Sequence, residues 1–346
     1  MILLDAVYIH QSGGKVLLEY FIKTILEKGL LNEFYFLLDN RIEGNFTNQI
    51  SEKRIFKINP SETERRKFYK EKIDDFTRVF CFANVPPPIK LKLQKVVILF
   101  HNALILDNKN MQYNLKTRFT FFLKKLYIKN HIHKNYQWIV QTKKMVELLT
   151  QKLTIPTNKI AVLPFYEENR FQKLNQKLPE NNGEFLYVAD GVKQKNHKIL
   201  LDAWGILFDN YNLPITLHLT IPANFNLLLA EIKRLQNKGV SIVNHGNCNL
   251  DELKELYQNC NYFIMPSLTE SFGLPLIEAA EAGCEIIAAD LDYVYEIVKP
   301  MAVFNPFDKT DIAKIVSEVY LNKVNNRTEI VVENKMSELI NLLTHA

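Results

Sequence analysis

Short apolar runs alternate with helical hydrophobic patterns along the first 170 residues of the chain. Ile2–Ile9 is β-rich, and after a turn that contains Ser12-Gly13-Gly14 the apolar positions from Val16 to Leu26 recur at helical spacing. The further short apolar runs, which we predict to be buried strands, are Phe34–Leu38, Arg78–Ala83, Val96–Phe100 and Trp138–Val140. Nearly continuous apolar strands separated by helices are typical of a parallel sheet that is covered on both faces.

The same alternation returns after a polar segment, Glu167–Gly183, which we interpret as an interdomain linker. The strands predicted beyond it are Phe185–Val188, Ile215–Thr220, Ser241–Asn244, Tyr262–Met265 and Glu285–Ala288. The helices predicted beyond it are Lys198–Phe208, Leu228–Asn237, Leu250–Gln258 and Pro275–Ala282, followed by a helical pattern after Thr310 with no strand evident. We therefore predict an α/β fold with two doubly wound, Rossmann-like domains, residues 1–170 and 171–346, that face each other across a cleft. The C-terminal helical segment is counted with the second domain and could pack back on the first.

The composition favours a protein with two buried cores, because 47% of the 346 residues are hydrophobic and 23% are charged. No apolar run approaches the ~18–20 residues that span a bilayer, and Met1–Leu4 leads to Asp5 without the features of a signal peptide. We therefore expect a cytoplasmic protein. The four cysteines are scattered and contain no CxxC pair, so we expect reduced thiols.

The net charge of +5 divides into +12 for residues 1–170 and −7 for residues 171–346. No acidic residue occurs between Asp107 and Glu147, where aromatic and aliphatic residues alternate with basic ones: Lys109, Lys116, Arg118, Lys124, Lys125, Lys129, Lys134, Lys143 and Lys144. Such a segment is typical of an interfacial membrane element or of a site for a lipid-linked phosphate. A core-packed helix with a solvated basic face is the alternative, and nucleic acid is disfavoured because no recognition motif accompanies the charge.

The segment from Met265 to Ala280 carries two carboxylates around a predicted strand–loop–helix edge. The strand ends at Pro266, the loop carries Glu270, and Pro275 suits the first turn of the helix that contains Glu278. Free N–H groups and the helix dipole at this turn favour an anionic or polyhydroxylated ligand. Two carboxylates here could hold two sets of sugar hydroxyls, whereas a plain helix start with an acidic first turn is the alternative.

This segment resembles the E-x7-E signature of retaining glycosyltransferases with the GT-B fold, in family 4, also called glycosyl transferases group 1. The resemblance implies that Glu270 contacts the hydroxyls of the donor sugar and that Glu278 binds the nucleotide ribose. It also implies that the backbone amides of Ser271, Phe272 and Gly273 contact sugar and phosphate. The second domain would then bind the nucleotide sugar, and the first would be the acceptor side.

A second match is the run from Phe185 to Lys198, which resembles the first strand and loop of the family's donor domain. Lys195 falls on the lysine that binds the donor diphosphate, although a solvated surface lysine is the alternative. Asp190 occupies the position of the family's arginine. Because an aspartate cannot neutralise a diphosphate, either Lys193 or Lys195 compensates, or the phosphates are held less tightly.

In the first domain, the resemblance gives roles to a glycine pair and a histidine. Gly13 and Gly14 match the loop beneath the donor phosphates and near the acceptor, with a simple tight turn as the alternative. His101 follows the strand Val96–Phe100 and matches the histidine that reaches the donor sugar, with a structural histidine as the alternative. The strands in Trp138–Thr142 and Ile160–Pro164 also fall in family order, although Gln141-Thr142 replaces the usual serine after the first of them.

The resemblance implies a retaining hexosyl- or N-acetylhexosaminyltransferase that uses a UDP- or GDP-linked sugar. Its acceptor would be a glycan or a polyprenyl-diphosphate-linked glycan in cell-surface polysaccharide synthesis. Glu270, His101 and Lys195 would be its catalytic residues. No metal or other cofactor is expected, because Asp290-Leu291-Asp292 lies on a loop that in the family is beyond the donor.

The acceptor or membrane side would be formed by Lys116, Arg118, Lys124, Lys125 and Lys129, with peripheral contact to the anionic inner face of the cell membrane. A nucleotide-sugar epimerase on the same fold is one alternative function. A catalytically degenerate module that binds a sugar nucleotide is another, and Asp190 keeps that alternative open.

Overall fold

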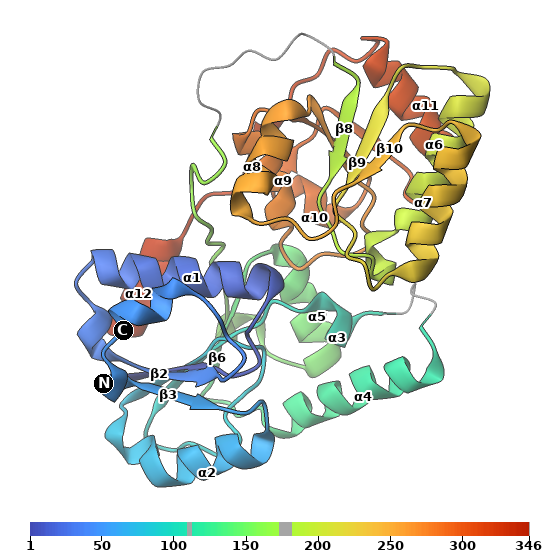
Figure 1. Cartoon of the computed structure of the whole chain (residues 1–346). Helices are drawn as coiled ribbons and strands as arrows, with labels where there is room; N and C mark the ends of the chain where they lie inside the picture. Colours follow the sequence, from blue (N-terminus) through green and yellow to red (C-terminus); the bar gives the residue numbers. More distant parts are fainter. Residues whose placement is uncertain (109–112, 173–181, 346) are drawn as a thin grey trace. The chain divides into compact units, whose positions relative to one another are not determined.

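The chain folds into two units in the computed structural model, which describes residues 1–108, 113–172 and 182–345 (Figure 1). The first unit is Met1–Glu168 with Glu333–Ala346, and the second is Asn169–Val332. Residues 333–346, at the C-terminus, thus group with the first unit. Lys109 and most of the predicted linker lie outside the described residues.

The first unit is built on a 7-stranded parallel sheet with the order β3-β2-β1-β4-β5-β6-β7. Its strands are β1 (Ile2–Ala6), β2 (Phe34–Asp39), β3 (Ile55–Ile58), β4 (Arg78–Cys81), β5 (Lys95–Leu99), β6 (Gln137–Val140) and β7 (Ile160–Val162). Its helices are α1 (Ser12–Glu27), α2 (Glu62–Lys72), α3 (Ala103–Leu106), α4 (Leu115–Asn130), α5 (Lys143–Leu153) and α12 (Met336–Thr344). The sequence did not predict the edge strand β3, because its residues are mostly half-buried or exposed and Lys57 interrupts its apolar positions.

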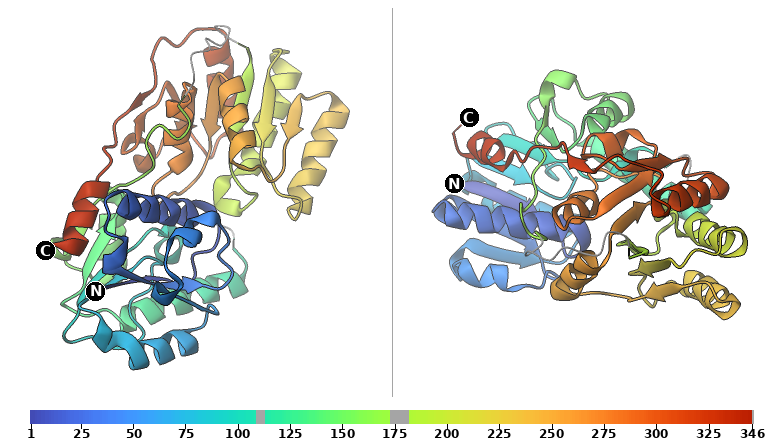
Figure 2. Two further views of the ribbon diagram at one scale, coloured as in Figure 1. Left: turned by 60° about the vertical axis from the view of Figure 1, so that its left-hand side comes forward. Right: turned by 90° about the horizontal axis from the view of Figure 1, so that it is seen from above.

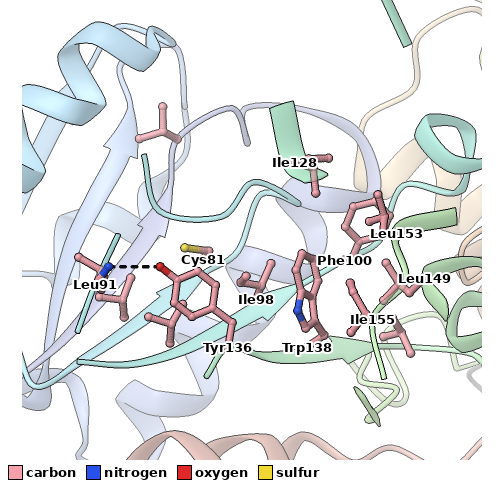
Figure 3. Packing of buried hydrophobic residues seen from close by; sticks show 14 of the residues in the cluster. Cys81, Leu91, Ile98, Phe100, Ile128, Tyr136, Trp138, Leu149, Leu153 and Ile155 are labelled. Atoms are coloured by element: carbon pink, nitrogen blue, oxygen red, sulfur yellow. Dashed lines mark hydrogen bonds between the residues drawn. The ribbon is translucent and has the colours of Figure 1, made fainter. Parts of the chain in front are cut away.

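Helices cover both faces of this first sheet. In Figure 1, α1 and α12 lie on one face and α2 and α4 on the other. α1 packs Phe21 against Phe34 and Phe80, with ring centroids 5.7 and 5.5 Å apart. On the other face, Ile128 of α4 lies in one core with Trp138, as Figure 3 shows. Because truncation of a buried aromatic side chain typically costs ~3–5 kcal/mol, both layers stabilise the sheet.

The second unit has a 6-stranded parallel sheet with the order β10-β9-β8-β11-β12-β14 and a small antiparallel pair, β13-β15. Its strands are β8 (Glu184–Tyr187), β9 (Thr216–Leu219), β10 (Ile242–Asn244), β11 (Tyr262–Met265), β12 (Glu285–Ala289), β13 (Val298–Lys299), β14 (Ala302–Phe304) and β15 (Glu329–Ile330). Its helices are α6 (His197–Asn210), α7 (Asn226–Lys238), α8 (Leu250–Asn259), α9 (Leu274–Glu281), α10 (Asp292–Tyr295) and α11 (Lys309–Tyr320).

One expectation for this unit was wrong, since β15 lies beyond Thr310, where no strand was evident. A two-residue strand is too short to produce an alternating hydrophobic pattern, and both of its residues are exposed. Figures 1 and 2 show α6, α7 and α11 on one face of the second sheet and α8 and α9 on the other. Two doubly wound parallel sheets confirm the predicted fold class.

Candidate functional site

The candidate site of the second unit lies at the carboxyl ends of β8 and β11, which are neighbours in the sheet. The chain leaves β8 toward α6 on one face and leaves β11 toward α9 on the other. At such a topological switch point the two following loops diverge and leave room for a ligand. Here the loops are residues 188–196 and residues 266–273.

A lysine and a glutamate meet between these loops. Lys195 ends a 3₁₀ turn, Lys193–Lys195, and its Nζ lies 2.6 Å from Oε1 of Glu270. The two side chains are 17% and 14% exposed, so the pair is largely screened from solvent and still reachable. The N–H of Leu268 donates to the carbonyl of Gln194 at 2.8 Å and ties the loops together. Two residues that are 75 positions apart thus place a cation and a carboxylate at one point.

Tyrosine and serine hydroxyl groups hold the two loops of this site in place. Tyr187 donates to the carbonyl of Lys195 at 2.9 Å, and its hydroxyl lies 2.8 Å from Oγ of Ser267. Tyr293 donates to the carbonyl of Ser267 at 2.8 Å. Tyr187, Ser267 and Tyr293 are all buried. The backbone beside Lys195 and the backbone before Glu270 are therefore held in place before any ligand binds.

The loop after β8 is held by His197 at the start of α6. Nε2 of this buried imidazole donates to the carbonyl of Asp190 at 2.9 Å. Asp190 and Lys193 are both exposed. A Cβ at Gly191 would lie 2.4 Å from Cγ of Phe225, so any other residue at this position would force the Phe225 ring to shift.

Lowering the pH is expected to destabilise the second unit through His197. Burial lowers the pKa of this imidazole from 6.5 to about 4, so the unfolded chain binds the proton more readily than the folded one. Stability is therefore full above pH 6.5 and is lost as the pH falls toward 4, by at most about 3 kcal/mol. Urea unfolding followed by Trp204 fluorescence in a Trp138→Phe background should show this loss with His197 intact and a clearly smaller loss with His197→Gln. An equal pH dependence in both proteins would contradict it.

The second predicted carboxylate, Glu278, lies within α9. Gly273, with φ of 95°, precedes the helix in a left-handed conformation that glycine adopts without strain. Tyr257 of α8 donates to Oε2 of Glu278 at 3.0 Å. Burial raises the pKa of Glu278, while the Tyr257 hydroxyl and the nearby positive charge of Arg170 act in the opposite direction. Tyr257 was missed, because a buried tyrosine on a helix carries no motif.

The loop that joins these two glutamates is anchored by an aromatic side chain. Phe272 is buried, and Ser271 is half-buried beside it. The predicted contacts of the amides of Ser271, Phe272 and Gly273 with a ligand stay predictions.

In the first unit, the structure brings Gly14 and His101 together. Gly13 and Gly14 lie in the first turn of α1, and a Cβ on Gly14 would lie 3.6 Å from Nε2 of His101. The N–H of His101 donates to Oδ1 of Asn84 at 2.5 Å. Burial lowers the pKa of His101 to about 4, so its imidazole is neutral near pH 7. Its predicted role toward the donor sugar stays a prediction.

A buried polar network in the same unit was missed. Asp5 of β1 accepts from Nε of Arg65 at 2.8 Å and from the hydroxyl of Tyr69 at 2.6 Å. Arg65 also lies 3.2 Å from Glu62, which accepts a hydrogen bond from Tyr127 of α4. The Arg65 and Asp5 side chains are 2% and 1% exposed. The sequence did contain one indication of this network, because Asp5 lies within an otherwise apolar strand.

Among the described residues, no group of three or more His, Cys, Asp or Glu side chains is arranged to hold a metal ion. Asp290, in the Asp-Leu-Asp run, is exposed and accepts from the hydroxyl of Tyr295 at 2.7 Å. The expectation of metal-independent chemistry stays a prediction.

Comparison with known proteins identifies the family. Residues 167–336 match the model of the family described as glycosyl transferases group 1. The O-antigen chain mannosyltransferase RfbU of Salmonella typhimurium is 27% identical over 162 residues, which are 46% of this chain and 44% of RfbU. The chain spans less than half the length of the curated relatives it matches.

Two solved structures share the fold. WaaG, a glycosyltransferase involved in lipopolysaccharide biosynthesis, has a TM-score of 0.70 at 12% identity, with 100% of both chains covered. Anabaena Alr3699/HepE in complex with UDP and glucose has a TM-score of 0.65 at 15% identity, with 93% of this chain and 90% of that chain covered. This chain therefore has the GT-B fold, and its residues 167–336 belong to the glycosyl transferases group 1 family.

Proposed function

We propose that this protein is a retaining glycosyltransferase of cell-surface polysaccharide synthesis that uses a nucleotide diphosphate sugar. The observation that carries the proposal is the Lys195–Glu270 pair at the switch point of the second sheet. An ammonium suits a diphosphate, and a carboxylate suits sugar hydroxyls. The family match, the mannosyltransferase activity in the name of RfbU and the UDP and glucose bound by HepE support it.

In the proposed reaction, donor binding replaces the Lys195–Glu270 ion pair by two contacts with the donor. Lys195 moves to the diphosphate and stabilises the charge that develops on the leaving group. Glu270 accepts hydrogen bonds from the hydroxyls of the sugar and positions it. Glu278, held by Tyr257, binds the ribose hydroxyls.

The bond changes follow a front-face path that retains the anomeric configuration. The bond between the anomeric carbon and the diphosphate oxygen breaks, and the nucleotide diphosphate leaves with the electron pair. The acceptor hydroxyl oxygen forms the new glycosidic bond on the same face, and its proton passes to the departing phosphate oxygen. His101, neutral near pH 7, would act as a hydrogen-bond partner of the sugar rather than as a charged acid.

The proposal is tested by nucleotide release from the purified full chain. The donors are UDP- and GDP-linked hexoses and N-acetylhexosamines, each with and without a polyprenyl-diphosphate-linked glycan. We expect acceptor-dependent release of nucleotide with one donor and a product whose anomeric configuration, read by NMR, equals that of the donor.

Three outcomes would contradict it. Inversion of the anomeric centre would exclude retention. Isomerisation of the donor sugar without an acceptor would indicate an epimerase. Donor binding by calorimetry with no transfer to any acceptor would indicate a degenerate sugar-nucleotide module.

A further inference from the structure

Glu278 is held by a hydroxyl group from a neighbouring helix. α8 and α9 lie on the same face of the second sheet (Figure 1), and the buried Tyr257 of α8 donates to Oε2 of Glu278 at 3.0 Å. Among the described residues, Oε1 of Glu278 accepts no hydrogen bond. Because both oxygens of an ionised carboxylate accept hydrogen bonds, this arrangement fixes one oxygen and leaves the other for a ligand.

The residues from Asn169 to Phe171 are attached to the last turn of α9. Glu281 accepts from the N–H of Asn169 at 2.8 Å and from the N–H of Phe171 at 3.5 Å. The buried Phe171 ring meets the Tyr257 ring edge to face, with centroids 5.0 Å apart. This short segment is therefore attached both to α9 and to the tyrosine that holds Glu278.

Arg170, in the middle of this segment, brings a positive charge close to Glu278. Its guanidinium lies 5.8 Å from the centroid of the Phe171 ring. Burial raises the pKa of Glu278, the hydrogen bond from Tyr257 and the charge of Arg170 lower it, and the charge of Glu281 raises it. Burial also raises the pKa of Tyr257, so its hydroxyl keeps the proton that it donates. Tyr257 and Arg170 thus oppose the protonation of Glu278 that burial favours.

We propose that Tyr257 and Arg170 are positioning residues of the donor site, which keep Glu278 ionised and orient its free oxygen toward the ribose hydroxyls. This inference rests on the proposed function, in which Glu278 binds the ribose. An ionised carboxylate accepts hydrogen bonds roughly twice as strong as those of a neutral group. The two residues act through Glu278, so their removal should weaken donor binding at a pH where the wild type still binds well.

The protonation of Glu278 can be measured in the full chain without any nucleotide. Carboxyl ¹³C NMR of glutamate-labelled protein gives its titration, assigned by the signal that Glu278→Gln removes. Tyr257→Phe keeps the ring against Phe171 and removes only the hydroxyl, and it should raise the midpoint by about one pH unit or more. Arg170→Gln should raise the midpoint as well, whereas Arg170→Lys keeps the charge and should stay near the wild type. Tyr262→Phe, at a buried tyrosine of β11, is the matched control and should leave the midpoint unchanged.

The contact with the ribose is measured by calorimetry with UDP and GDP and with their 2′,3′-dideoxy counterparts. Each nucleotide and its counterpart carry the same diphosphate, so the titration of the diphosphate cancels from the ratio of their dissociation constants. In the wild type we expect the dideoxy form of the preferred nucleotide to bind at least about tenfold more weakly. In Tyr257→Phe this ratio should fall as the pH is lowered, with a midpoint about one unit above that of the wild type.

An unchanged Glu278 midpoint in Tyr257→Phe would overturn the proposal, because a tyrosine with a purely structural role would not move it. A dissociation-constant ratio near one in the wild type would overturn it as well. If that ratio accompanies normal glycosyl transfer, only this proposal fails and the proposed function stands. Binding of no nucleotide would overturn both.

Discussion

Lys195→Ala is expected to lower the turnover number for glycosyl transfer by roughly 10²–10³-fold, the usual cost of removing one charge-stabilising donor from a transition state. The geometry predicts a further loss in donor affinity. Without the ammonium that lies 2.6 Å from it, the Glu270 carboxylate would repel the diphosphate that we propose Lys195 binds. Initial-rate kinetics and calorimetry with the donor found in the release assay measure the two effects separately.

A double-mutant cycle distinguishes this account from a simple loss of folding. Adding Glu270→Gln to Lys195→Ala removes the uncompensated carboxylate, so donor affinity should recover in part while turnover stays low. Lys198→Ala, an exposed lysine on the adjoining α6, is the matched control and should behave as the wild type does. If Lys195→Ala retains turnover within about twofold of the wild type, the assignment of the diphosphate contact is wrong.

Asp5→Ala is expected to destabilise the first unit by about 3–5 kcal/mol, because it removes the buried carboxylate of the pair and leaves the Arg65 guanidinium with the half-exposed Glu62 as its counter-charge. Tyr69 also loses an acceptor for its hydroxyl. The chain offers a reporter for each unit, since its two tryptophans, Trp138 and Trp204, are buried in different units. Urea unfolding of Asp5→Ala in a Trp204→Phe background should show the loss, and in a Trp138→Phe background should show little.

A double variant that removes both charges tests the Asp5–Arg65 ion pair further. Asp5→Leu/Arg65→Met should be much less destabilised than the sum of its single variants, because neither of the two fully buried charges is left without the other. Asp74→Ala, which removes an exposed carboxylate of the same unit, should stay within about 0.5 kcal/mol of the wild type. Additive effects in the double variant would contradict a direct coupling between Asp5 and Arg65.

Much of the candidate site could be predicted because its residues sit in local motifs. Glu270 and Glu278 flank a helix start, and Lys195 follows a buried strand, so their neighbours along the chain indicate their position. Their partners could not be predicted in the same way. Tyr257 reaches Glu278 from another helix, and its own surroundings in the sequence are those of a core residue.

Hydrophobic periodicity determined the two parallel sheets, because burial on both faces imposes apolar residues on every central strand. It left β3, β14 and β15 undetected, since such short strands at the margins of a sheet bury too little to show a pattern. The sequence also located the basic segment but left two interpretations of it open, a core helix and an interfacial one.

Only the tertiary structure decided which groups meet and which face of a helix is covered. Lys195 and Glu270 form a pair because they follow β8 and β11, which are hydrogen-bonded neighbours in the sheet. The sequence between the two strands does not indicate that they are neighbours. On α4 the apolar residues divide into a buried set around Ile128 and an exposed stripe around Phe119 and Phe122. The sequence determines which residues are apolar, whereas the packing of neighbouring elements determines which of them remain in contact with water.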